Sequence, residues 1–130
     1  PPTWAEKAPF INQMEINAVD KKARELLRKT SKLNAGAIAS HTIKLAAGKH
    51  YAFFADCADE CSNIDLSLQQ DGATIKADTA ADASPMFGFY ATQAGNYQLV
   101  SLMTSCVSAD KKGCKYTVQV FESERQLIAD

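Results

Sequence analysis

The chain after Gly36 is a series of short apolar runs separated by turn residues, and this pattern limits the possible folds more than any other feature. Within the runs apolar and polar residues alternate, as in strands with one buried face. Asp71-Gly72 between two runs is a two-residue hairpin signal, because glycine accepts positive φ and aspartate tolerates it. Seven strands are expected, at residues 37–45, 50–56, 64–70, 74–77, 85–91, 96–104 and 114–121. The pattern predicts a mainly β protein, an antiparallel β-sandwich.

The alternation also assigns the faces of these strands. The expected core consists of Tyr51, Phe53, Ala55, Ile64, Leu66, Leu68, Tyr97, Leu99, Met103, Tyr116, Val118 and Val120. Phe54, Val100 and Leu102 fall on the opposite side, so a second element has to cover them.

An amphipathic helix is expected before the sandwich. Residues 1–10 contain three of the four prolines and predict an extended lead-in. Residues 16–33 place Ile16, Val19, Ala23, Leu26, Leu27 and Leu33 at steps typical of a helix, and the helix is the available cover for the outward apolar groups. Its lysines and arginines leave membrane association as the alternative. Residues 1–35 are thus expected as lead-in plus helix and residues 36–130 as sandwich, in one folding unit.

The four cysteines form two close pairs, Cys57 with Cys61 and Cys106 with Cys114. An even count at local spacing favours two disulfides, each closing a short loop between predicted strands, and an oxidising compartment. We therefore expect a periplasmic or secreted protein. A four-thiolate zinc site is the alternative, although the seven residues between the second pair fit such a site poorly.

Charge excludes some partners. The net charge is −1, and the nine Lys/Arg of residues 1–50 lie largely in the expected helix, where a solvated face explains them. We therefore predict no nucleic-acid partner. No apolar run approaches the ~20 residues that cross a bilayer, so no transmembrane segment is expected.

Several short motifs recur in a known order. These are Leu45-x-x-Gly48-x-x-Tyr51-x-Phe53, Ile64-Asp65-Leu66-x-Leu68, Asp71-Gly72, Asp78, Phe89-x-Ala91 and Gly95-x-Tyr97-x-Leu99-Val100. The order resembles the bacterial pre-peptidase C-terminal domain family over roughly residues 37–121, and the clamped acidic turn resembles its cysteine-containing proteobacterial branch. The resemblance implies a jelly-roll-like sandwich of about seven strands that serves secreted proteins as a non-catalytic accessory domain. The expected helix, the cysteines and the lack of an attached peptidase depart from the family pattern.

Acidic residues gather around the first cysteine pair. Candidate calcium ligands are Asp56, Asp59, Glu60, Asn63 and Asp65, and a looser set is Asp71, Asp78 and Asp82. Calcium takes six to eight oxygen ligands, which clustered acids in a rigid loop can supply, and some relatives in the resembled family are stiffened by calcium. Solvated loop acids are the competing interpretation. Calcium is the one cofactor that the sequence suggests.

Catalytic signals are weak. His41 and His50 lie in or beside predicted strands, outside any nucleophile motif, and oxidised cysteines supply no thiolate. We predict that the protein is not an enzyme. Phe87, Phe89 and Tyr90 share one strand and cannot all point inward, so one face of that strand is a candidate binding surface for a sugar or a peptide, with core packing as the alternative.

Two functions follow from these observations. The first is a binding or accessory module of pre-peptidase C-terminal type that recognises a protein partner or an envelope or matrix polymer. The alternative is a small periplasmic inhibitor or immunity-type protein, which blocks an enzyme with a loop fixed by a disulfide.

Overall fold

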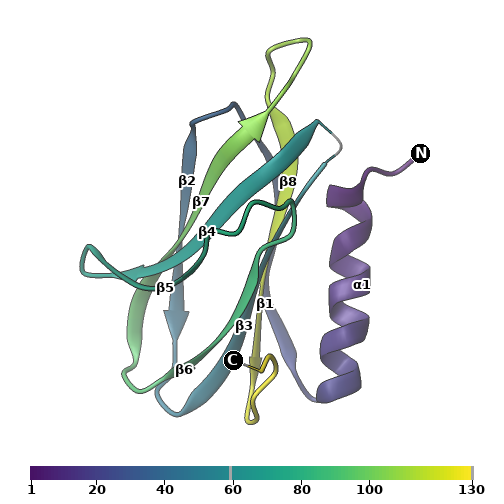
Figure 1. Cartoon of the computed structure of the whole chain (residues 1–130). Helices are drawn as coiled ribbons and strands as arrows, with labels where there is room; N and C mark the ends of the chain where they lie inside the picture. The colour runs from purple at the N-terminus through teal and green to yellow at the C-terminus, as the bar shows by residue number, and fades with distance from the viewer. Residues whose placement is uncertain (59, 130) are drawn as a thin grey trace.

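The computed structural model describes residues 1–58 and 60–129. One helix, α1 (Trp4–Val19), precedes eight strands, which are β1 (Arg24–Leu33), β2 (Ile38–Leu45), β3 (Lys49–Cys57), β4 (Cys61–Gln70), β5 (Ala73–Asp78), β6 (Met86–Ala91), β7 (Gly95–Cys106) and β8 (Cys114–Ser123). The strands form two antiparallel sheets that face each other (Figure 1). The mainly β architecture is confirmed, with eight strands instead of about seven.

The strand order is that of a jelly roll. One sheet has the order β1-β8-β3-β6 and the other β2-β7-β4-β5. Strands therefore pair as first with last, second with seventh, third with sixth and fourth with fifth, so that the chain folds as one long hairpin wrapped into two sheets. Positive φ at Asp71 (52°) and Gly72 (79°) forms the expected hairpin turn between β4 and β5.

The core fills the space between the sheets. All twelve residues expected there belong to one buried cluster, and Tyr51, Tyr97, Tyr116 and Phe53 are its largest members. Strand alternation therefore determined the inward face correctly, since a shift of one residue would have turned these side chains to solvent.

The N-terminal third differs from the expectation. The prediction of a helix over 16–33 is wrong after Val19, because residues 24–33 form β1 and pair with β8. Leu26 and Leu27 pack against the sandwich core from this strand, so the leucine stripe that suggested membrane association does not lie on a helix. The lead-in prediction is also wrong, because α1 begins at Trp4 and contains Pro9. The sequence placed a boundary between lead-in plus helix and sandwich after residue 35. In the structure β1 lies before this boundary and pairs with β8 in the same sheet, so residues 24–33 belong to the sandwich.

Pro9 is accommodated by hydrogen bonds between the helix and the sheet. A proline has no N–H, so the carbonyl of Ala5, four residues earlier, has no helical partner at this point. The hydroxyl of Thr117 donates to that carbonyl at 2.6 Å, and Gln119 Nε2 donates to the Pro9 carbonyl at 3.1 Å. Both partners lie on β8, so the proline fixes the helix to the sheet.

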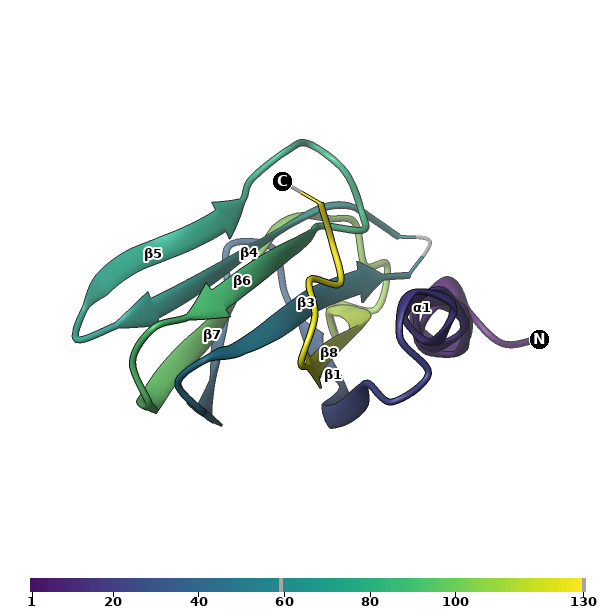
Figure 2. The same cartoon turned by 90° about the horizontal axis from the view of Figure 1, so that it is seen from below.

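The helix covers part of one outer face (Figure 2). Ile16 packs with Phe54 and Phe121 in a second buried cluster, so the expected cover exists for Phe54. Val100 and Leu102 lie on β7 in the other sheet, away from the helix, and the prediction that it covers them is wrong. No helix in the described part of the chain is long and apolar enough to span a membrane.

Candidate functional site

Two disulfide-closed segments meet at one end of the sandwich. The structure contains Cys57–Cys61, which closes the β3–β4 turn, and Cys106–Cys114, which closes the β7–β8 loop. These are the pairs favoured from the sequence, and with all four cysteines oxidised the zinc alternative lacks its thiolates. We call the described residues of the two segments, 57–58, 60–61 and 106–114, the disulfide platform.

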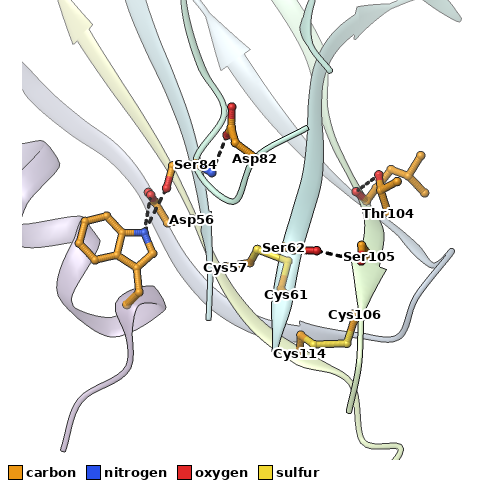
Figure 3. Close-up of a disulfide and its surroundings, with 12 residues drawn as sticks. Asp56, Cys57, Cys61, Ser62, Asp82, Ser84, Thr104, Ser105, Cys106 and Cys114 are labelled. Carbon is orange, nitrogen blue, oxygen red and sulfur yellow. Dashed lines mark hydrogen bonds between the residues drawn. A yellow bond between two sulfur atoms is a disulfide. The ribbon is translucent and has the colours of Figure 1, made fainter. Parts of the chain in front are cut away.

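Strand pairing brings the two segments together. Cys61 on β4 lies opposite Cys106 on β7, and the neighbouring hydroxyls of Ser62 and Ser105 are hydrogen-bonded at 2.9 Å (Figure 3). The N–H of Ala58 donates to the carbonyl of Lys115 on β8 at 2.9 Å. Each segment is therefore held by its own disulfide and by strands on both sides.

Glu60 joins the two segments directly. Its carbonyl accepts a hydrogen bond from the N–H of Val107 at 2.9 Å, and its carboxylate accepts one from the N–H of Ala109 at 3.3 Å. One residue of the β3–β4 turn thus binds two backbone donors of the β7–β8 loop. The loops form one surface instead of two independent ones.

Local hydrogen bonds shape the β7–β8 loop. Asp110 accepts from Ser108 Oγ at 2.7 Å and from the N–H of Lys112 at 2.9 Å, and these bonds hold the pKa of Asp110 below its usual value. The bend continues with positive φ at Lys111 (59°) and Gly113 (92°). At Gly113 a Cβ would lie 2.7 Å from backbone atoms of Leu33, so the loop returns to β8 in close contact with the end of β1.

The β7–β8 loop projects beyond the ends of the neighbouring strands (Figure 1). Val107 is 78% exposed, the highest value among the large exposed hydrophobic residues. Lys111 and Lys112 follow it, and neither ammonium group has an ion-pair partner among the described residues. Below the tip lies a shallow hollow of about 230 Å³, and its wall contains charges of both signs, from Lys32, Lys115, Glu60 and Asp110. The arrangement provides a projecting contact surface, with an apolar residue and a lysine pair at the tip and charges of both signs below it.

The candidate calcium ligands are not gathered. Asp56 is buried beneath α1, where it accepts hydrogen bonds from Trp4 Nε1 at 3.1 Å and Asn12 Nδ2 at 2.9 Å. Burial raises the pKa of this carboxyl, and the hydrogen bonds partly oppose the change. Asp65 lies on β4 in the other sheet, and Asn63 lies near the start of the same strand. Glu60 is engaged with the β7–β8 loop, and Asp59 lies outside the described residues.

The looser acidic set is also dispersed. Asp71 forms the β4–β5 turn, Asp78 accepts from the N–H of Met86 at 3.1 Å, and Asp82 accepts from that of Ser84 at 2.8 Å. Among the described residues no group of three or more His, Cys, Asp or Glu is placed to hold a metal ion. The geometry gives the calcium prediction no support.

The aromatic strand divides as alternation requires. Phe87 stacks on Phe53 in the core with ring centroids 5.2 Å apart, and Phe89 packs edge-on against Tyr97 at 5.9 Å. Tyr90 is 50% exposed and lies 4.7 Å from the ring of His50 on β3. Of the three candidate binding residues, Tyr90 alone faces outward, at the end of the sandwich away from the disulfide platform.

Comparison with protein-family models finds none that matches this chain, and comparison with curated protein sequences likewise finds no match. Solved structures do show a similar fold. A periplasmic lysozyme inhibitor of g-type lysozyme, PliG from Aeromonas hydrophila, superposes with a TM-score of 0.53 and 12% identity, over 79% of this chain and 90% of that one. A de novo designed double-stranded β-helix gives a TM-score of 0.41 at 10% identity, over 75% of this chain and 99% of that one. At these identities the likeness concerns the fold alone.

Sequence reasoning identified the cysteine pairs but not the surface that they build. Val107, Lys111 and Lys112 gave no signal of their own, since an exposed valine and a lysine pair are ordinary in loops. The signal that could have found them is positional, because all three lie between Cys106 and Cys114. The contact of Glu60 with that loop depends on the β4–β7 pairing, which a linear pattern does not specify.

Proposed function

We propose that this protein is a non-catalytic, extracytoplasmic inhibitor, which binds an enzyme by placing the disulfide platform in the enzyme's cleft. The observation that carries the proposal is the joining of two disulfide-closed segments into one projecting surface through Glu60. A loop that is already ordered loses little conformational entropy on binding, so its contacts contribute more fully to affinity. A convex surface also fits a concave site.

The chemistry of the tip suggests the kind of cleft. Val107 offers an apolar contact at the base of the tip, and Lys111 and Lys112 outweigh the single negative charge of Asp110, so the loop is net positive. Glycoside hydrolases carry a pair of carboxyl groups in their clefts, which are complementary to such a tip. The fold of the lysozyme inhibitor PliG agrees with this choice, although its low identity transfers no residue roles. The two disulfides support a secreted or periplasmic location for this inhibitor.

A direct test uses a lysis assay. The purified oxidised protein is added to bacterial cell walls with a g-type lysozyme and, separately, with lysozymes of other types, and clearing and binding are recorded. We expect slower clearing and tight one-to-one binding for at least one enzyme. Lys111→Glu with Lys112→Glu should abolish both, because it reverses the charge facing the carboxylates.

The matched control changes a second lysine pair. Lys21 and Lys22 lie in the connection between α1 and β1 at the other end of the sandwich (Figure 1). Replacing both by glutamate makes the same change in net charge, and inhibition should persist. Equal loss in the two double variants would mean that net charge, not the platform, decides binding. Capture of wall polymer without inhibition of any enzyme would overturn the proposal and favour the accessory-module interpretation, for which the resemblance to pre-peptidase C-terminal domains stays a prediction.

A further inference from the structure

Strand β6 lies at one edge of its sheet, and no strand of the described residues pairs with its outer side. The carbonyl of Pro85 accepts a hydrogen bond from the N–H of Ala55 on β3, which fixes the pairing pattern of the two strands. In an antiparallel pair, hydrogen-bonded positions alternate, so Phe87 and Phe89 bond to β3. Residues 86, 88 and 90 therefore direct their N–H and C=O groups away from β3. Of these groups, the Met86 N–H has a partner, the carboxylate of Asp78 at 3.1 Å.

Gly88 makes this edge unusual. The residue is buried, yet neither its N–H nor its C=O has a hydrogen-bond partner among the described residues. Buried backbone groups are nearly always paired, because leaving them unpaired costs roughly as much as a lost hydrogen bond. A Cβ at this position would lie 2.9 Å from the Ile128 carbonyl, so the C-terminal segment packs over the glycine. The Gly88 N–H and C=O therefore point outward in the plane of the sheet, away from β3, while the C-terminal segment covers the face of the glycine.

The composition of β6 also differs from that of the other edge strands. In the described part of the chain, β1, β2 and β5 form the remaining edges, and each carries charged residues, such as Arg28, Lys44 and Asp78. Charges on an edge strand are a common means of preventing pairing with another chain. β6 reads MFGFYA and has none. Met86 and Tyr90 are 49% and 50% exposed, so the edge offers apolar contacts as well as hydrogen bonds.

The edge lies in a groove of about 270 Å³. Lys76 of β5 contributes to one wall, Gln126 and Ile128 of the C-terminal segment to another, and His50 and Tyr90 line one end. Figure 2 shows the C-terminal segment crossing the outer face of this sheet. Walls on both sides admit a single extended segment, whereas the edge of a second folded copy would meet them. A peptide is therefore the occupant that fits.

We propose that the β6 edge binds an extended, uncharged peptide segment of a partner protein by strand addition, with Gly88 and Tyr90 supplying the main-chain groups. Recognition of this kind takes its affinity from backbone hydrogen bonds and its selectivity from alternate side chains. A side chain of the peptide would pack on the ring of Tyr90. This site is separate from the disulfide platform, because His50 lies near the start of β3 and Cys57 at its end, roughly 23 Å away at strand spacing.

The first test varies the peptide. The probe is the fluorescein-labelled peptide KTVTVTK, in which the uncharged TVTVT stretch is the segment expected to pair and the flanking lysines keep the peptide soluble. It is titrated with the full chain up to about 1 mM and followed by fluorescence anisotropy. Two further peptides carry N-methyl groups on alternate residues, one set on the threonines and one on the valines. Strand addition uses every second N–H, so one methylated peptide should bind about tenfold more weakly than the other. Equal binding of the two methylated peptides, or no binding by the parent peptide, would overturn the proposal.

The second test varies the protein at Tyr90. Tyr90→Pro removes an N–H that points away from β3, so the native ladder is retained, as is usual for edge prolines. Tyr90→Val keeps the N–H and the strand preference while removing the ring. We expect the proline variant to lose binding and the valine variant to retain part of it. If Tyr90→Pro does not fold, the comparison of the two methylated peptides with the wild-type chain remains the test. A wild-type dimer in sedimentation without peptide that Tyr90→Pro abolishes would show that a second copy, not a peptide, occupies the edge.

Discussion

Opening the Cys106–Cys114 disulfide separates the contribution of loop rigidity to binding from its contribution to stability. The perturbation is Cys106→Ser with Cys114→Ser. The bridge spans eight residues of sequence, for which the loop-closure relation gives about 2.5 kcal/mol of stability. For a chain of 130 residues this corresponds to a fall in the unfolding midpoint of roughly 10 °C. The Cys57–Cys61 bridge spans four residues and gives about 2 kcal/mol by the same relation.

Binding should fall for a different reason. Without the bridge, Val107 and the two lysines of the tip sample more conformations, and ordering one backbone residue costs about 1–2 kcal/mol. The hydrogen bonds from Glu60 and the turn at Asp110 retain part of the order. We therefore expect a loss of affinity of at least about tenfold, equal to 1.4 kcal/mol, seen chiefly as faster dissociation from the inhibited enzyme.

A variant of equal stability cost provides the control. Leu127 is 7% exposed and packs in the second cluster, at the other end of the molecule from the platform. Leu127→Ala should cost about 2–3 kcal/mol, close to the cost of the opened disulfide. The midpoints of thermal unfolding are measured by calorimetry. The rates of dissociation from the enzyme are measured with the enzyme immobilised on a surface, at a temperature at which both variants are folded. Affinity within about twofold of wild type for the opened loop would refute the reasoning that rigidity serves binding.

Two further predictions concern single positions. In urea unfolding, Gly113→Ala should destabilise the protein more than Gly72→Ala. Both glycines have positive φ, but a Cβ at Gly113 would lie 2.7 Å from Leu33, whereas nothing lies within 4 Å of a Cβ at Gly72. Equal losses of stability would contradict the close contact at Gly113. Asp56→Asn tests the buried carboxyl, whose pKa in the folded protein is raised above 3.8, so the folded state takes up this proton at higher pH than the unfolded chain. As pH falls from 7 towards 4, the midpoint of wild type should therefore rise relative to that of Asp56→Asn, and a constant or falling difference would show that the pKa is not raised.

The parts of the fold that the sequence specified are those governed by local alternation. Each strand after Gly36 was located to within a few residues, because one face of each packs on the core and the other does not. The cysteine pairing followed from the same strands, since each bridge closes a connection between neighbours along the chain. These features depend on short stretches of sequence, which a single chain displays directly.

The N-terminal third failed because local preference and tertiary pairing disagree there. Residues 22–29 contain alanine, leucine, arginine, lysine and glutamate, which favour a helix. When β8 lies beside this segment, however, Leu26, Leu27 and Leu33 pack against the sandwich core from β1. Pairing along ten residues of β1 outweighs a propensity worth a few tenths of a kcal/mol per residue. A helix was therefore predicted where the sheet required a strand.

The helix that does form was hidden for a related reason. α1 directs chiefly small residues inward, together with Ile16 and with Asn12, which is bonded to both Asp56 and Gln119 at 2.9 Å, while Met14 is 73% exposed. A stripe of large apolar residues is the usual sign of a packed helix, and here small residues with hydrogen bonds to β3 and β8 fill most of that stripe. Such a polar interface specifies one position of the helix on the sheet, because each donor has to meet its acceptor. The same reasoning explains the disulfide platform, where Glu60 finds its partners through the β4–β7 pairing, so that the site depends on contacts that no stretch of the sequence contains by itself.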